Sequence, residues 1–133
     1  MRAFLVLLGS AAALAGAATA DATPRTALAV TYWAEGMGAG APVEWTLRCS
    51  PAGGSLPRAA AACVRVAKGG WRLFAPVAKN AVCTEIYGGP QTALVVGVVR
   101  GRRVWAKLQR RNGCEIERWS RVSPWLVPAG GTP

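Results

Sequence analysis

The sequence predicts one small domain that combines a β-sheet with a short helix, and three observations support this. Four segments are rich in β-branched residues or alternate apolar with polar residues, as strands do. An alanine-rich segment between the first two and the last two has helix start and stop signals. The chain has 133 residues and four cysteines, which suits a modest core that is supported by disulfides.

Two predicted strands lie in the first half of the chain. Residues 26–33 are β-rich and mostly apolar, and residues 43–49 alternate apolar with polar in the manner of a half-buried strand. Connections rich in glycine, alanine and proline lie at 36–42 and at 50–54. We expect both strands to belong to one sheet.

A short helix is predicted after the second strand. Pro57 stands where a helix can begin, because its missing N–H would have no partner in the first turn. Residues 58–67 are rich in alanine, and Gly69 with Gly70 ends the helix.

The second half of the chain predicts a β-hairpin. Residues 92–100 form a continuous β-branched run, Gly101 turns the chain, and residues 104–108 alternate again. A short helical turn after Cys114 and a further strand over residues 122–127 complete the prediction.

The N-terminus has the pattern of a secretory signal peptide. Arg2 supplies a positive charge, an apolar alanine-rich run extends over residues 4–17, and residues 18–20 form a small-x-small cleavage site. Glycine and serine residues make the run weakly hydrophobic for a bilayer-spanning anchor, which is the alternative. The predicted products are a signal peptide of residues 1–20 and a secreted, extracellular domain of residues 21–133. Because only Arg2 is lost among the charged residues, that domain stays strongly basic, with 15 Lys and Arg against 6 Asp and Glu.

The four cysteines favour disulfides over a metal site. The chain has no histidine and no CxxC, and the spacing of the cysteines does not match a zinc module. Four cysteines allow three pairings in an exported chain, and the spacing leaves these open. The cysteines are Cys49, Cys63, Cys83 and Cys114.

Catalysis has little support in the sequence. Without histidine there is no Ser-His or Cys-His pair, and no cofactor or metal is expected. A pair of carboxylates could make a glycosidase, but such enzymes need a larger sugar cleft than this domain easily builds. The acidic residues are Asp21, Glu35, Glu44, Glu85, Glu115 and Glu117.

Basic residues crowd the last third of the chain, interleaved with Trp105 and Trp119. Such a patch can bind nucleic acid, an anionic polymer or an acidic protein partner. The alternative, which we favour, is that the arginines cover the solvent faces of the hairpin while the tryptophans point to the core. The basic residues are Arg100, Arg102, Arg103, Lys107, Arg110, Arg111, Arg118 and Arg121.

The segment from Cys83 to Tyr87 is the strongest functional signal. A short extended segment that begins with a cysteine can be fixed by a disulfide and presented to a protease as a rigid, substrate-like loop. The sequence therefore favours a protease inhibitor, with a basic binding protein for an anionic polymer or acidic partner as the alternative.

These segments resemble the Streptomyces subtilisin inhibitor family. The resemblance runs from about residue 28 to residue 115, and all four cysteines fall at the family's positions. Its motifs are residues 46–51 (TLRCSP), Pro57 before an alanine-rich helix with Cys63, residues 82–87 (VCTEIY) followed by Pro90, residues 98–104 and residues 112–115 (NGCE).

The resemblance implies a fold and an assembly. The fold would be α+β, with a five-stranded antiparallel sheet, two short helices and two disulfides, Cys49–Cys63 and Cys83–Cys114. The secreted inhibitor would form a homodimer through its sheets. Its partner would be a serine endopeptidase of the subtilisin type or a related one.

The resemblance also implies the site. The reactive bond would join Glu85 to Ile86, with Glu85 entering the primary specificity pocket of the protease. Side-chain and disulfide contacts in the loop would come from Val82, Cys83, Thr84 and Tyr87, and Asn112 would support the loop from behind. The family usually has Met or Lys where this chain has Glu85, so a glutamate-preferring protease would suit the chain better than an ordinary subtilisin.

Overall fold

The computed structural model describes residues 15–17 and 25–130. Most of the predicted signal peptide and the start of the predicted mature domain therefore lie outside the described residues. The elements in chain order are β1 (Thr26–Trp33), β2 (Val43–Cys49), α1 (Ala59–Gly69), the 3-10 helix η1 (Gly70–Phe74), β3 (Thr92–Val99), β4 (Arg102–Leu108) and α2 (Gly113–Val122).

The sheet is antiparallel and has four strands within residues 25–130, in the order β2-β1-β3-β4. The five strands that the family resemblance implies are therefore not found in these residues. The separate prediction of a strand over residues 122–127 is also wrong. Val122 ends α2, and the Leu126 N–H donates to the Val122 carbonyl at 2.8 Å, so the backbone turns at the helix end. Pro124 has no N–H to donate to a sheet. Residues 122–127 are rich in apolar side chains because Val122, Leu126 and Val127 are buried in the core, although they do not form a strand.

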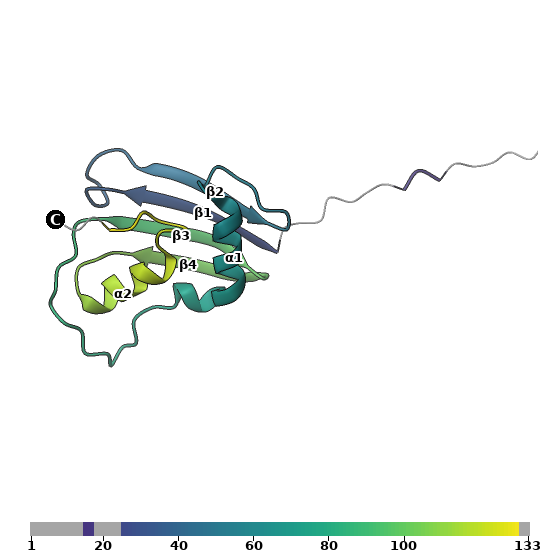
Figure 1. The fold of residues 1–133 in the computed structure, drawn as a ribbon. Coiled ribbons are helices and arrows are strands. Elements are labelled where there is room, and N and C mark those ends of the chain that lie inside the picture. The colour runs from purple at the N-terminus through teal and green to yellow at the C-terminus, as the bar shows by residue number, and fades with distance from the viewer. Residues whose placement is uncertain (1–14, 18–24, 131–133) are drawn as a thin grey trace, which may run out of the picture.

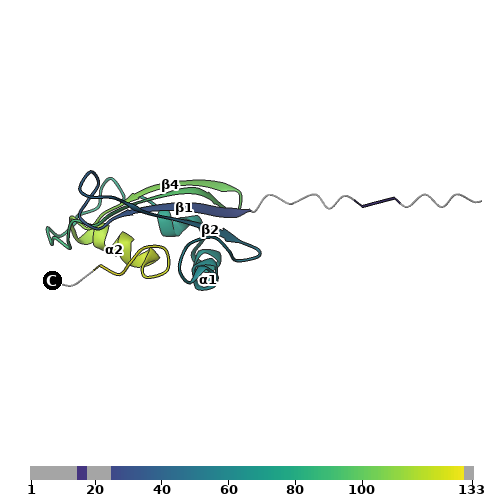
Figure 2. The same ribbon diagram turned by 90° about the horizontal axis from the view of Figure 1, so that it is seen from above.

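The molecule has two layers, with the helices on one face of the sheet (Figures 1 and 2). Every second residue of a strand points toward the helices and is buried. The residues between them point to the opposite face of the sheet. The helix layer contributes Ala62 and Val66 from α1, Leu73 and Phe74 from η1, and Trp119 from α2. The sheet contributes Leu28, Val30, Leu47, Ala93, Val95, Val99, Val104, Ala106 and Leu108.

The helix predictions are confirmed, although the second helix is longer than the expected turn. The Asn112 side chain accepts a hydrogen bond from the Glu115 N–H at 3.0 Å and caps the start of α2. The helix ends before Ser123, whose position ahead of Pro124 disfavours helical backbone. An asparagine followed three residues later by glutamate is a helix-start pattern, and it marks the beginning of this helix in the sequence.

Two disulfides tie the layers together. Cys49 pairs with Cys63, which joins the end of β2 to α1. Cys83 pairs with Cys114, which joins the connection before β3 to the first turn of α2. The pairing is the one that the family resemblance implies, and within residues 25–130 no cysteine is free.

The other face of the sheet carries no helix in the described part of the chain (Figure 2). Thr46, Ala29, Val96 and Trp105 form one row of neighbours across the four strands on this face. Trp105 is 68% exposed, which contradicts the expectation that it points to the core, whereas Trp119 is buried as expected. None of the helices in the described residues is long and apolar enough to cross a bilayer.

Candidate functional site

The segment from Val82 to Tyr87 lies in the long connection between η1 and β3, and all of its residues except Cys83 are exposed. Figure 1 shows this connection looping out beyond α2. The segment has no regular secondary structure, and its apolar side chains face solvent: Val82 is 98% exposed and Tyr87 66%. Thr84, Glu85 and Ile86 are also exposed, and only Cys83 is half-buried. Several exposed apolar residues on one loop make it a candidate interaction site.

The N-terminal half of this loop is fixed to the start of α2. Besides the disulfide from Cys83 to Cys114, the Gly113 N–H donates to the Thr84 carbonyl at 2.9 Å. Gly113 also packs against the Thr84 side chain, because a Cβ on Gly113 would lie 2.1 Å from Thr84 Oγ1. Only glycine permits this approach.

The C-terminal half of the loop is fixed by Arg110. The Gly88 N–H donates to the Arg110 carbonyl at 2.7 Å, and the Arg110 guanidinium donates back to the Gly88 carbonyl. The guanidinium also donates to Gln91 Oε1 at 3.2 Å. Gly88 packs closely against Ile116 of α2: a Cβ atom added to Gly88 would lie 2.9 Å from the Ile116 side chain. The loop is therefore held on both sides of the bond between Glu85 and Ile86.

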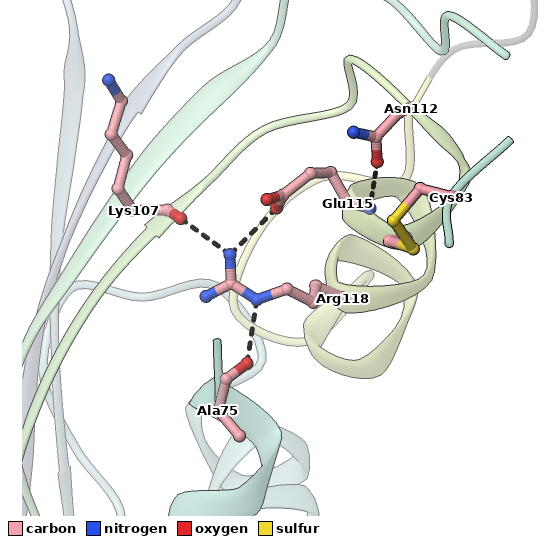
Figure 3. A network of polar contacts seen from close by, with 7 residues as sticks. Ala75, Cys83, Lys107, Asn112, Glu115 and Arg118 are labelled. Atoms are coloured by element: carbon pink, nitrogen blue, oxygen red, sulfur yellow. Dashed lines mark hydrogen bonds and ion pairs between the residues drawn. A yellow bond between two sulfur atoms is a disulfide. The ribbon is translucent and has the colours of Figure 1, made fainter. Parts of the chain in front are cut away.

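A buried polar network fixes α2 beneath the loop (Figure 3). Arg118 forms an ion pair with Glu115 at 2.9 Å, and it donates to the carbonyls of Ala75 at 2.9 Å and Lys107 at 3.2 Å. Arg118 is 7% exposed and Glu115 is 8% exposed. Burying this charge is tolerable because the carboxylate and two carbonyls satisfy it. The network connects α2 to η1 and to the end of β4.

Asn112 lies next to Gly113 and behind the loop. Its side-chain oxygen accepts from the Glu115 N–H, so this side chain caps α2. The loop contact at this place is the backbone bond from Gly113 to Thr84. Asn112 therefore acts on the loop indirectly: it fixes the start of α2, and the backbone of Gly113 at that start contacts the loop.

The predicted basic patch of the last third is divided by the structure. Arg118 is buried in the network, Arg110 holds the loop, and Arg121 forms an ion pair with Glu117 at 3.2 Å. Sequence reasoning assigned Arg110 and Arg118 to the surface and missed their roles. The three-residue spacing of Glu115 and Arg118 on a helix was the available signal.

The start of the C-terminal tail packs against the domain. The Trp119 Nε1–H donates to the Pro128 carbonyl at 3.0 Å. Gly130 lies so close to Arg110 that a Cβ there would clash with the guanidinium at 1.9 Å. Residues 128–130 therefore lie against Trp119 and Arg110. Residues 131–133 lie outside the described part.

One comparison with known protein families gives a match. A family model described as "Subtilisin inhibitor-like" matches residues 24–112, which is more than half of the chain and includes the exposed loop. A search of curated proteins finds no match. The family points to inhibition of a protease and not to an enzyme. With this match, two disulfides and an exposed loop that is held at both ends, the chain belongs to the subtilisin inhibitor-like family.

Proposed function

We propose that the chain is a secreted inhibitor of serine endopeptidases and that Glu85–Ile86 is its reactive bond. The observation that carries the proposal is the fixation of the exposed loop on both sides of this bond. Cys83 and Thr84 are tied to α2, and Gly88 is tied to Arg110. Family membership supports a protease as the partner.

The loop binds as a substrate would. Its extended backbone hydrogen-bonds to the substrate cleft, while the side chains of Val82, Thr84, Glu85 and Tyr87 enter the pockets. Because the loop is ordered before binding, little conformational entropy is lost on association. This makes a tight complex possible from an interface of ordinary size.

Cleavage of the bond is reversible on this scaffold. When the protease nucleophile attacks the Glu85 carbonyl, an acyl-enzyme forms and the amine of Ile86 is released. The Ile86 end stays near, because Gly88 is bonded to Arg110, and the Glu85 end stays near through Thr84 and Cys83. The amine then attacks the acyl-enzyme and re-forms the peptide bond.

Glu85 selects the partner. Its carboxylate forms no ion pair with any residue in 25–130, so it is available to the protease pocket. An unpaired carboxylate is costly to bury in an apolar pocket, whereas a pocket with cationic or polar groups compensates its charge. The proposed partner is therefore a serine endopeptidase that prefers glutamate.

The test is an inhibition panel of subtilisin-type, trypsin-type and glutamate-specific serine proteases. The wild type should inhibit the glutamate-specific enzyme most strongly. Glu85→Lys should shift inhibition toward trypsin-type enzymes by about tenfold or more, because the new cation pairs with the acid of their pocket. Glu85→Met should shift inhibition toward subtilisins by about tenfold or more, because no unpaired charge is then buried in their apolar pocket. Glu44→Lys, at an exposed residue of β2, is the charge-matched control and should change nothing.

Early cleavage during long incubation should occur between Glu85 and Ile86. If both Glu85 variants inhibit all three enzymes as the wild type does, or if another bond is always cut first, the reactive bond is not here.

We propose further that two copies associate through the open face of the sheet. This face has a cavity of about 400 Å³, lined by Ala27, Ala29, Thr46, Arg48, Val96 and Gly97. Trp105 projects from the same face. If a two-fold axis relates the two copies, Trp105 of each copy can enter the hollow of the other. The surface is then self-complementary.

We also propose that residues 1–20 direct export and are removed. The supporting pattern is the positive residue, the apolar run and the small residues at the cleavage site. The mass of the exported protein should correspond to a chain that begins at Asp21. A chain that keeps residue 1 would contradict this.

A further inference from the structure

Basic side chains from four chain segments gather where β3 turns into β4. The Arg25 carbonyl accepts from the Gly101 N–H at 2.8 Å, which holds the start of β1 against this turn. The Arg100 guanidinium donates to the Ala67 carbonyl, which holds the end of α1 there as well. The cationic end so formed consists of the exposed residues Arg25, Lys68, Arg72, Arg100, Arg102 and Arg103.

No acidic side chain balances these charges within residues 25–130. Glu35 and Glu44 lie at the opposite end of β1 and β2, Glu85 is on the loop, and the other two glutamates are on α2. The ion pairs of the described residues all lie within α2. Six uncompensated cations at one end of a small domain create a strong local positive potential.

Trp71 organises this cationic end. The Arg102 guanidinium carbon lies 3.7 Å from the centre of the Trp71 ring, and that of Arg72 lies 6.0 Å from it. Stacking on a ring uses the face of a guanidinium, while its N–H donors point outward in the guanidinium plane. Arg102 is therefore oriented and still free to donate two parallel hydrogen bonds to a carboxylate or sulfate.

A groove continues from this cluster along β4. It has a volume of about 160 Å³. Its lining includes Trp71, Phe74, Pro76 and Arg102, and it ends at Trp105, which belongs to the proposed dimer face. Arginines beside aromatic side chains suit a ligand that alternates charged groups with rings.

The cationic end is far from the reactive loop. Arg102 begins β4, whereas the loop is held by Arg110, just beyond the end of β4 at Leu108. Six residue steps along a strand span about 20 Å. A ligand that stays at the cationic end therefore leaves the reactive loop uncovered.

We propose that the cationic end is a second binding surface, and that its ligand is an acidic polysaccharide that carries carboxylate or sulfate groups. Arg102 covers one face of Trp71, so this ring is not the open stacking platform that single-stranded nucleic acids need. A folded acidic protein needs a large complementary surface, whereas a flexible polyanion can wrap around a projecting end. The inhibitor then stays attached to an anionic matrix while its loop remains accessible. This inference is independent of the proposed protease target.

The experiment compares two variants with the same loss of charge. The first replaces Lys68, Arg72 and Arg102 by glutamine at the cationic end. The control replaces Arg58, Lys79 and Lys107 by glutamine at exposed positions elsewhere. Binding to heparin and to polygalacturonate is measured as a function of NaCl, and thermal unfolding checks that both variants are folded.

The first variant should lose about tenfold or more in affinity for both polysaccharides, as expected for three exposed charge contacts, and the control much less. Inhibition by the polysaccharide-bound protein should equal that of the free protein. The proposal is overturned if both variants weaken equally, or if bound polysaccharide blocks inhibition. It is also overturned if single-stranded DNA or an acidic globular protein of equal charge binds more tightly than the polysaccharides.

Discussion

Gly113 is the residue on which the geometry of the loop depends most directly. Its N–H donates to the Thr84 carbonyl, and its Cα hydrogens face the Thr84 hydroxyl. A methyl group at this position has no room unless Thr84 moves, because Thr84 Oγ1 would lie 2.1 Å away. Thr84 immediately precedes Glu85 of the proposed reactive bond, so its displacement disturbs recognition by the protease.

We predict that Gly113→Ala weakens inhibition by about tenfold, since overpacking a close contact costs about 1–3 kcal/mol. In a Thr84→Ala background the same change should cost much less, because the hydroxyl that it meets is gone. The four inhibition constants form a double-mutant cycle, in which residues in contact show coupling. Strictly additive effects would show that the contact between Gly113 and Thr84 does not control the loop.

The ionisation of Tyr32 depends on its surroundings in the fold. Burial raises the pKa of its phenol above the ordinary value, the Arg110 charge opposes this, and Glu35 adds to it. The ring stacks on Trp45 at 6.0 Å and lies 6.2 Å from Trp119. The neutral phenol is thus the form that the folded state favours.

A raised pKa in the folded state gives stability that is complete below the unfolded pKa, about 10, and is lost as the pH rises through the folded value. We therefore predict that the free energy of unfolding falls above about pH 10 and that Tyr32→Phe makes this fall smaller. Urea unfolding of both proteins from pH 8 to pH 11 measures the difference. Parallel curves would mean that Tyr32 does not contribute.

The two disulfides connect different pairs of structural elements, so we expect different effects on inhibition when they are removed. Cys49–Cys63 joins β2 to α1, remote from the loop, whereas Cys83–Cys114 joins the loop itself to α2. Their sequence separations are 14 and 31 residues. Loop-closure entropy then gives both a similar contribution of about 3–4 kcal/mol to stability.

Replacing either pair by serine should therefore lower the free energy of unfolding by a similar amount. Only the Cys83→Ser/Cys114→Ser variant should also weaken inhibition, by about tenfold or more, because its loop must be ordered on binding. The Cys49→Ser/Cys63→Ser variant is the matched control and should inhibit normally below its melting temperature. Equal loss of inhibition in both would indicate an effect of global stability alone.

At the scale of the whole molecule, the open face of the sheet governs the proposed dimer. Trp105→Arg should give a monomer in sedimentation at concentrations where the wild type is a dimer, because a charge cannot be buried in the apolar hollow. Val64→Arg, on the solvent side of α1, makes the same change at an exposed residue and should leave the dimer intact. A dimeric Trp105→Arg protein would exclude this face as the interface.

Several features of the fold were predictable because they depend on local patterns. The alternation in residues 43–49 and the β-branched run at 92–99 predict strands, and the alanine-rich segment ending at Gly69 predicts α1. The run at 122–127 was misassigned, because an apolar run has the same composition whether it is a strand or a buried turn. The position of the loop was predictable from Cys83 and the residues that follow it.

Local sequence patterns were enough to predict the four strands, the first helix and the exposed segment with Glu85, since each is a property of neighbouring residues. The tertiary structure decided which charges are buried, because Arg110 and Arg118 meet carbonyls and a carboxylate from segments that folding brings together. Folding also brings Arg25, Arg72 and Arg102 together at the end of the sheet where β3 turns into β4. Desolvation and close approach depend on distances in space, and a linear sequence does not record those distances.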